Sequence, residues 1–114
     1  MPQYKLVVLS EAVPGREQEY DDWYTGRHLA DVLRVPGFVA AQRFRLQPNG
    51  DGPAPPAENL ALYEIESDDI AETMRLLLAA SQSDDMPISG ALDLSRTKSY
   101  VAVPVCARVE AGSA

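Results

Sequence analysis

Cysteine and histidine are scarce in this chain, and their scarcity excludes whole classes of site. Among 114 residues there is one cysteine, Cys106, and one histidine, His28. A single cysteine forms no disulfide within the chain. One histidine and one cysteine are also too few for a structural zinc site, although a lone histidine can still ligate haem iron. We therefore expect no metal site and no cofactor.

Positive charge and long apolar runs are also missing. Ten Lys and Arg stand against seventeen Asp and Glu, for a formal net charge of −7. Such a balance repels phosphate backbones and anionic lipid, so we expect neither a nucleic-acid nor a membrane partner. The first apolar run, residues 6–10, is shorter than the about 7–15 residues of a signal-peptide core or the about 20 of a membrane helix. The expected location is the cytoplasm.

Motifs for common cofactors and nucleophiles are absent as well. The sequence has no glycine-rich loop of the kind that holds a phosphate, and no Gly-x-Ser-x-Gly turn. Nucleotide-dependent enzymes and serine hydrolases are therefore disfavoured. For an enzyme, this leaves cofactor-free acid/base chemistry in a small pocket.

What is present is an ordered succession of strand-like and helix-like segments. Short apolar or alternating runs predict strands at residues 4–9, 38–46, 60–65 and 97–105. Helical periodicity predicts helices at residues 17–33 and 68–81, the second with Ser67 as its cap. Pro14-Gly15, Pro36-Gly37 and the proline-rich loop 47–57 separate these segments.

The order β-α-β-β-α-β predicts an α+β fold of ferredoxin-like topology. Two interleaved β-α-β units form a four-stranded antiparallel sheet with both helices on one face. We expect one domain over residues 1–114, because the chain is too short for two. The other sheet face would be left bare in water, so we also expect a homodimer.

The first predicted helix concentrates large side chains with polar tips. One side carries Tyr20, Trp23, Tyr24, Arg27, His28 and Asp31, while an apolar set lies roughly opposite: Leu29, Val32 and Leu33. A straight helix cannot bury both sets. Gly26 lies between them and lowers helix stability by about 1 kcal/mol relative to alanine. We therefore predict a kink or break between Gly26 and Ala30, with His28 at a helix end facing a cavity.

Two residues of this helix are candidate catalytic groups. His28 titrates near neutrality and suits a general acid/base; alternatively it is a core or interface histidine bonded to Asp31 or a tyrosine. Tyr24, one turn earlier, either donates to a substrate oxygen or is a core tyrosine. Trp23 favours a pocket wall or simple packing over a reactive role.

The strands supply further candidates. In the second strand, alternation groups Arg43 and Arg45 with Val39 and Ala41, opposite Phe38, Ala40, Gln42, Phe44 and Leu46. If the arginine face lines the cavity, Arg43 would bind a carboxylate or enolate, with Arg45 in support; otherwise both are solvated edge residues. The remaining candidates for substrate contact are Asp31, Tyr63, Ser81 and Tyr100, each of which also has a plain packing interpretation.

The combination of these segments resembles the EthD-like branch of the dimeric α/β-barrel superfamily. The residues that carry the resemblance are Val13-Pro14-Gly15-Arg16-Glu17, Tyr20, Trp23-Tyr24, His28-Leu29, Asp31-Val32-Leu33, Val35-Pro36-Gly37-Phe38 and Ala40-Ala41-Gln42-Arg43-Phe44. The resemblance covers nearly the whole chain and implies a ferredoxin-like fold and a dimer. The superfamily includes isomerases, decarboxylases, dehydratases, cofactor-free monooxygenases and haem-degrading enzymes, so the fold does not settle the function.

The residues and the resemblance together favour an enzyme. The expected function is that of a cofactor-independent isomerase or lyase acting on a small unsaturated carboxylate or an enol, such as a product of aromatic ring cleavage. In this scheme His28 moves a proton, Tyr24 assists, and Arg43 binds the substrate anion. The alternatives are a cofactor-free monooxygenase of a phenolic or polyketide substrate and a non-catalytic dimer that binds a small ligand.

Overall fold

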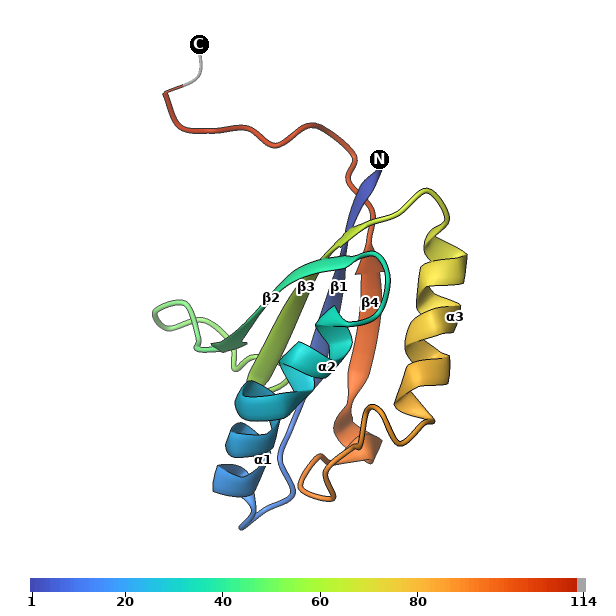
Figure 1. Cartoon of the computed structure of the whole chain (residues 1–114). Helices are drawn as coiled ribbons and strands as arrows, with labels where there is room; N and C mark the ends of the chain where they lie inside the picture. Colours follow the sequence, from blue (N-terminus) through green and yellow to red (C-terminus); the bar gives the residue numbers. More distant parts are fainter. Residues whose placement is uncertain (113–114) are drawn as a thin grey trace.

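Four antiparallel strands form one sheet in the order β2-β3-β1-β4 (Figure 1). The computed structural model describes residues 1–112. The strands are β1 (Gln3–Ser10), β2 (Phe38–Arg45), β3 (Asn59–Glu66) and β4 (Lys98–Ala102). β1 pairs antiparallel with both β3 and β4, and β3 pairs antiparallel with β2. This is the predicted ferredoxin-like arrangement, in which β3 and β1 occupy the centre.

The helices are α1 (Glu17–Trp23), α2 (Leu29–Leu33) and α3 (Ile70–Ser81). Between α1 and α2 runs η1 (Tyr24–His28), a π-helix, so the three segments form one interrupted helix over the predicted range. The core lies between these helices and the inner sheet face, where Leu6, Ala61, Tyr63 and Ile65 are buried against Tyr20, Tyr24 and Val32. The opposite sheet face has no helical cover (Figure 1).

The simple alternation predicted for the second strand is wrong at its start. The β2–β3 register shifts between Phe38 and Ala40, where Val39 forms a bulge. Because a bulge inserts one residue without a partner, Phe38 faces the same side as Ala41 and is buried, while Val39 is exposed. The predicted position of Arg43 on the Ala41 face is unaffected.

The cap of the second predicted helix also differs from the expectation. Asp69 is the N-cap of α3 and accepts a hydrogen bond from the backbone N–H of Glu72 at 3.1 Å. Ser67 instead accepts from the Thr73 hydroxyl at 2.7 Å. The helix therefore begins later than predicted, and a carboxylate accepts the hydrogen bond from its first turn.

The end of the chain departs most from the predicted strand at residues 97–105. A short 3₁₀ turn, η2 (Leu94–Arg96), precedes β4, which ends at Ala102. The following segment leaves the sheet in an extended course (Figure 1).

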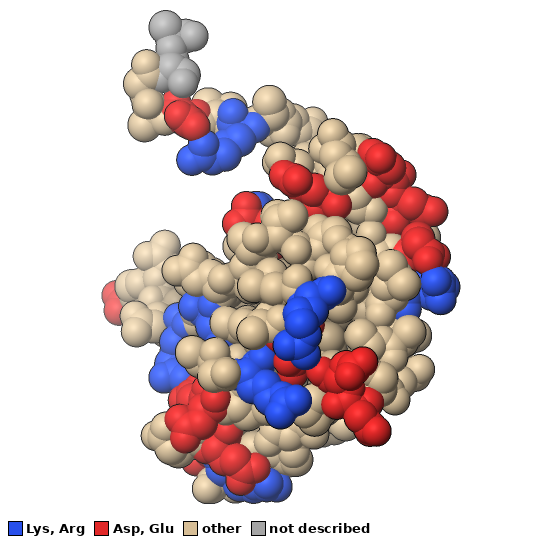
Figure 2. All heavy atoms as spheres, viewed as in Figure 1, with Lys and Arg blue, Asp and Glu red and all other residues tan. Residues whose placement is uncertain are grey.

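In the view of Figure 2, basic side chains in the middle of the face lie next to acidic ones. No helix within residues 1–112 is long and apolar enough to cross a membrane.

Candidate functional site

The π-helix η1 determines how the first helix presents its aromatic side chains. The prediction of an interruption near Gly26 is confirmed: regular helix ends at Trp23 and resumes at Leu29. A π-turn widens the helix by one residue per turn and is frequent at functional sites. Here it brings Tyr24 into the core and leaves His28 partly buried against the cavity described below.

A cavity of about 420 Å³ lies between the inner sheet face, the first helix and α3. The sheet contributes Leu6, Val8, Tyr63 and Ser99, and the first helix contributes Tyr24, His28 and Val32. The other wall is mostly apolar and comes from α3 and the loop after it, including Met74, Leu77, Leu78, Ser81 and Ile88. Four predicted site residues thus meet here: His28, Tyr24, Tyr63 and Ser81.

The imidazole of His28 is held by aromatic rings and has no hydrogen bond at one nitrogen. It stacks on Trp23, with ring centroids 4.5 Å apart, and stands edge-on to Tyr24 at 5.0 Å. Its Nδ1 atom is buried without a hydrogen-bond partner among the described residues. Burial lowers the pKa of His28 to about 4, and the nearby Asp31 carboxylate opposes this shift. The ring is therefore neutral at physiological pH.

Two tyrosines line the cavity together with His28. The Tyr63 hydroxyl donates to the Tyr24 hydroxyl at 3.2 Å, which leaves the proton of Tyr24 available for another acceptor. Burial raises the pKa of Tyr24 far above its ordinary value, with the adjacent Tyr63 adding to the effect. Burial likewise raises the pKa of Tyr63 to about 12. Both hydroxyls stay protonated and serve as hydrogen-bond donors rather than bases.

Arg43 lies behind the aromatic residues and does not line the cavity, so the predicted pocket wall of His28, Tyr24 and Arg43 is not formed. Its guanidinium packs over the rings of Tyr20 and Tyr24, 5.1 and 4.9 Å from their centroids. It donates to Asp21 at 2.9 Å and to the Thr25 hydroxyl at 2.8 Å. With its donors occupied, Arg43 fixes η1 to β2 instead of facing a ligand.

Asp31 and Arg45 are also engaged with partners outside the cavity. Asp31 is buried and accepts from Arg27 at 3.2 Å and from Arg34 at 2.8 Å. Arg45 is exposed and pairs with Asp21 at 3.3 Å and with Glu58 at 3.6 Å. The geometry gives both residues structural partners and places neither in the cavity wall.

Trp23 and Tyr100 do not line the cavity either. The Trp23 indole donates to the Pro87 carbonyl at 3.1 Å, which ties the helix to the loop after α3, and the ring supports His28 from behind. Tyr100 pairs with Val7 on the outer sheet face and is 56% exposed. The strand residue that reaches the cavity is Ser99, which the sequence analysis missed. The alternation of β4 against Leu6 and Val8 was the signal that could have found it.

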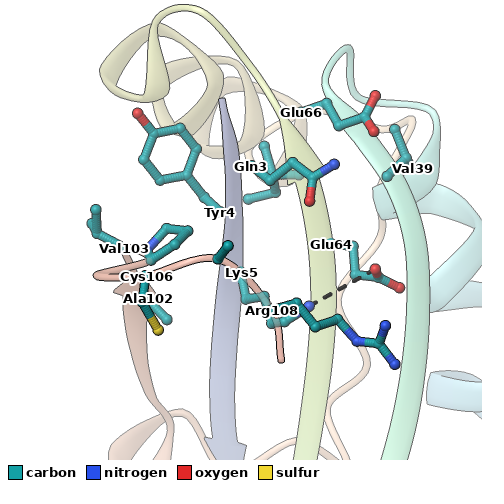
Figure 3. Close-up of a pocket in the computed structure, with 13 residues that line it drawn as sticks. Gln3, Tyr4, Lys5, Val39, Glu64, Glu66, Ala102, Val103, Cys106 and Arg108 are labelled. Atoms are coloured by element: carbon teal, nitrogen blue, oxygen red, sulfur yellow. Dashed lines mark ion pairs between the residues drawn. The ribbon is translucent and has the colours of Figure 1, made fainter. Parts of the chain in front are cut away.

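A second hollow, of about 460 Å³, lies at one end of the sheet beneath the C-terminal segment (Figure 3). Its walls include Tyr4, Val39, Val103 and Arg108. The Lys5 ammonium and the Glu64 carboxylate there pair with each other at 3.8 Å (Figure 3). We favour the cavity beside α3 as the candidate site, because its lining combines a histidine whose Nδ1 lacks a partner among the described residues with two protonated tyrosine hydroxyls.

Comparison with solved structures identifies the fold. An EthD family protein from Bacillus halodurans superposes with a TM-score of 0.57 at 16% identity, covering 90% of this chain and 99% of that one. The haem degrader MhuD from Mycobacterium tuberculosis, in a structure with two haems in its active site, superposes with a TM-score of 0.60 at 17% identity, covering 93% and 99%. The chain has the ferredoxin-like α+β fold of these structures.

This ferredoxin-like α+β fold extends over nearly the whole chain. A protein of unknown function from Nitrosomonas europaea superposes with a TM-score of 0.58 at 19% identity and covers 98% of both chains. No family model and no curated protein matches the sequence. Within residues 1–112, no three His, Cys, Asp or Glu side chains gather as a metal site would require.

Proposed function

We propose that the protein is a cofactor-independent isomerase or lyase that moves protons on a small enolisable molecule bound beside α3. The observation that carries this proposal is the neutral imidazole of His28, whose Nδ1 has no partner within the described residues, edge-on to the ring of Tyr24 in the wall of the same cavity. A structural histidine bonded to Asp31 or to a tyrosine is not what the geometry shows at this nitrogen. A neutral imidazole and a protonated tyrosine hydroxyl in the wall of one cavity suit enolisation.

The proposed step begins with neutral His28. The imidazole takes a proton from the carbon next to a carbonyl group, and the electron pair of that C–H bond moves to the carbonyl oxygen as an enolate. Tyr24 donates a hydrogen bond to this oxygen. His28 then returns the proton to a different carbon in an isomerisation, or the enolate expels a leaving group in an elimination.

The low pKa of His28 is compatible with this step because the two charges form together. An isolated imidazolium is disfavoured in the cavity, as burial lowers the pKa of His28 to about 4. An enolate beside the ring favours the protonated form and raises that pKa during the reaction. The base is thus neutral in the free protein and charged only when the substrate anion is present.

Solvent-exchange measurements test the proposal without knowledge of the natural substrate. The probe is 2-tetralone in D₂O, with deuterium uptake followed by NMR and oxygen consumption by electrode. We expect exchange catalysed by the wild-type protein, and a rate about 10²–10⁴-fold lower in His28→Gln, a typical range for loss of a general base. Equal exchange by both proteins contradicts the proposal. Oxygen consumption that depends on His28 would favour a cofactor-free monooxygenase. If the wild-type protein catalyses no deuterium exchange, a non-catalytic ligand-binding role is favoured.

The residues of the cavity do not fit haem, the ligand bound in the MhuD structure. Haem carries two carboxylates, whereas the walls contain no Lys or Arg within residues 1–112. The imidazole also lacks the second-nitrogen partner that usually orients a metal-ligating histidine. We expect no His28-dependent Soret shift on titration with haem.

We further propose that the protein is a homodimer whose subunits meet through the outer sheet face. Cross-strand neighbours on this face include Val7 with Leu62, Leu9 with Leu60, and Phe44 with Leu60. An apolar sheet face of this kind is a common interaction surface. Light scattering should give twice the chain mass of 12.4 kDa. Leu62→Glu should lower the measured mass toward the monomer, whereas Leu94→Glu, at an exposed position outside the sheet, should not.

A further inference from the structure

The walls of the cavity beside α3 carry no permanently charged side chain. Although 24% of the chain is charged, no Lys, Arg, Asp or Glu within residues 1–112 lines this space. The polar groups that do line it are hydroxyls and the imidazole of His28, and hydroxyl-bearing Thr97 and Ser99 lie on the strand side. A binding site with this composition offers hydrogen bonds but no counter-ion.

Two charged residues next to the cavity lining, Arg43 and Asp31, have partners of their own. Arg43 is separated from the cavity by the ring of Tyr24 and is bonded to Asp21 and Thr25. The Asp31 carboxylate is neutralised by Arg27 and Arg34. A ligand carboxylate in this space would lose its hydration without gaining a cation, and the burial of such an unpaired charge is strongly unfavourable.

We infer that the cavity selects uncharged, largely apolar ring compounds with hydroxyl or ketone groups and discriminates against carboxylates. The inference rests on the proposed function and narrows it, because it removes the unsaturated carboxylate from the expected substrates and keeps the enol. The apolar side chains of Met74, Leu77 and Ile88 match a hydrocarbon ring. The hydroxyls of Tyr24 and Ser99 match an oxygen substituent.

His28 is the one side chain of the cavity that could become a cation for a carboxylate, by binding a proton along with the ligand. A carboxylate that binds as its neutral acid takes up a proton in the same way. The titratable groups around it are Tyr24, on its own helix, and Tyr63, on the sheet, both protonated at neutral pH, and Asp31, which is paired. Because the pKa of His28 is about 4, recruiting it at about pH 7 reduces affinity roughly a thousandfold. Carboxylate binding should therefore strengthen about tenfold for each pH unit of acidification.

A ring-matched pair of probes tests this selection by calorimetry or fluorescence. 2-Naphthol is uncharged and 2-naphthoate is anionic from about pH 5.5 to 7.5. We expect naphthol to bind at least about tenfold more tightly at the upper end, with an affinity independent of pH, and naphthoate to strengthen with acid because a proton binds along with it. The inference is overturned if naphthoate binds as tightly as naphthol, or more tightly, at about pH 7.5. It is also overturned if neither probe binds.

A matched pair of lysine variants locates the effect. Leu78 lines the cavity from α3 and is 58% exposed, so Leu78→Lys should fold and place a cation at the rim. Ala79, the next residue of α3, is exposed outside the lining. We expect Leu78→Lys to shift the naphthoate-to-naphthol preference about tenfold toward the anion, and Ala79→Lys to leave it unchanged. An equal shift in both variants means binding elsewhere and contradicts the inference. Tetralone exchange is measured separately, so its absence refutes the proposed reaction without touching the binding preference.

Discussion

The two sides of the Tyr24 ring differ sharply in character. On one side, Arg43, Asp21 and Thr25 form a tight set of ionic and hydrogen-bonded contacts between β2 and the first helix. On the other side, an apolar cavity holds a neutral histidine with no bond at Nδ1 among the described residues. The aromatic ring keeps the two environments apart, so that charge serves to fix the helix while the cavity stays free of it.

This separation has a physical rationale. The π-turn η1 would be costly without support, because it replaces regular helical hydrogen bonding around Tyr24. The bond from Arg43 to Thr25, inside η1, and the packing of the guanidinium on the ring supply that support from behind. With the helix fixed in this way, His28 Nδ1 on the cavity side can remain without a partner among the described residues. Buried polar groups without partners are often found at functional sites.

The largest effect expected from this contrast is a loss of stability in acid caused by His28. Its pKa is about 4 in the folded chain against about 6.5 when unfolded. The unfolded chain therefore binds the proton first, and the free energy of unfolding falls as pH decreases through this window, by at most about 3 kcal/mol. Above the unfolded pKa the contribution is absent.

Urea unfolding of the wild type and of His28→Gln at several pH values isolates this term. Carboxylates elsewhere titrate in both proteins, so only the difference between the two curves reports on His28. A difference that stays constant with pH would place the imidazole in a solvated environment and break the contrast between the two sides.

The next largest effect on stability is expected from Arg43, on the side of the Tyr24 ring that carries the ionic contacts. The Arg43 side chain is only 14% exposed and contacts Asp21, Thr25 and two tyrosine rings. Arg43→Met should lower the free energy of unfolding by about 2 kcal/mol, because the half-buried Asp21 loses a partner and the two tyrosine rings lose the guanidinium packed on them. Arg45→Met is the matched control at an exposed position and should cost less than about 0.5 kcal/mol.

The affinity for 2-naphthol shows whether Arg43 only stabilises the fold, together with Asp21 and Thr25, or also contributes to ligand binding. If it does, the affinity of Arg43→Met for 2-naphthol should change less than about threefold once the folded fraction is taken into account. A larger loss of affinity than of stability would assign Arg43 to the ligand site, as the sequence pattern first suggested.

The sequence predicted the layers of the fold better than the phase of its strands. Apolar periodicity and the breaks at Pro14-Gly15 and Pro36-Gly37 were enough to order the elements, because both are local signals. The bulge at Val39 was not predictable, since it depends on how β2 pairs with β3. Tyr100 was assigned to the site although its strand phase turns it outward, opposite Val7.

The placement of the candidate residues was predictable where it depended on one helix and not where it depended on pairing across elements. Gly26 among large aromatic residues correctly indicated an interrupted helix and brought His28 and Tyr24 together. Arg43 was placed on the correct face, but an arginine that points inward binds either a ligand or an acid from another element. Only the fold shows that Asp21 lies within reach.

The smallest effect expected is also the most direct comparison of the two sides, because it removes one hydroxyl from each. Tyr20 and the buried Ser10 share a hydrogen bond of 2.6 Å next to Arg43, and the Tyr63 hydroxyl donates to Tyr24 beside the cavity. Tyr20→Phe and Tyr63→Phe should each cost about 1 kcal/mol of stability, the typical net value of a buried hydrogen bond. Only Tyr63→Phe should weaken 2-naphthol binding, by about three- to tenfold, because Tyr24 then loses the donor that orients its hydroxyl. Thermal melts and naphthol titrations on both variants make the measurement. Equal losses of affinity would mean that the Tyr24 ring does not separate the two environments.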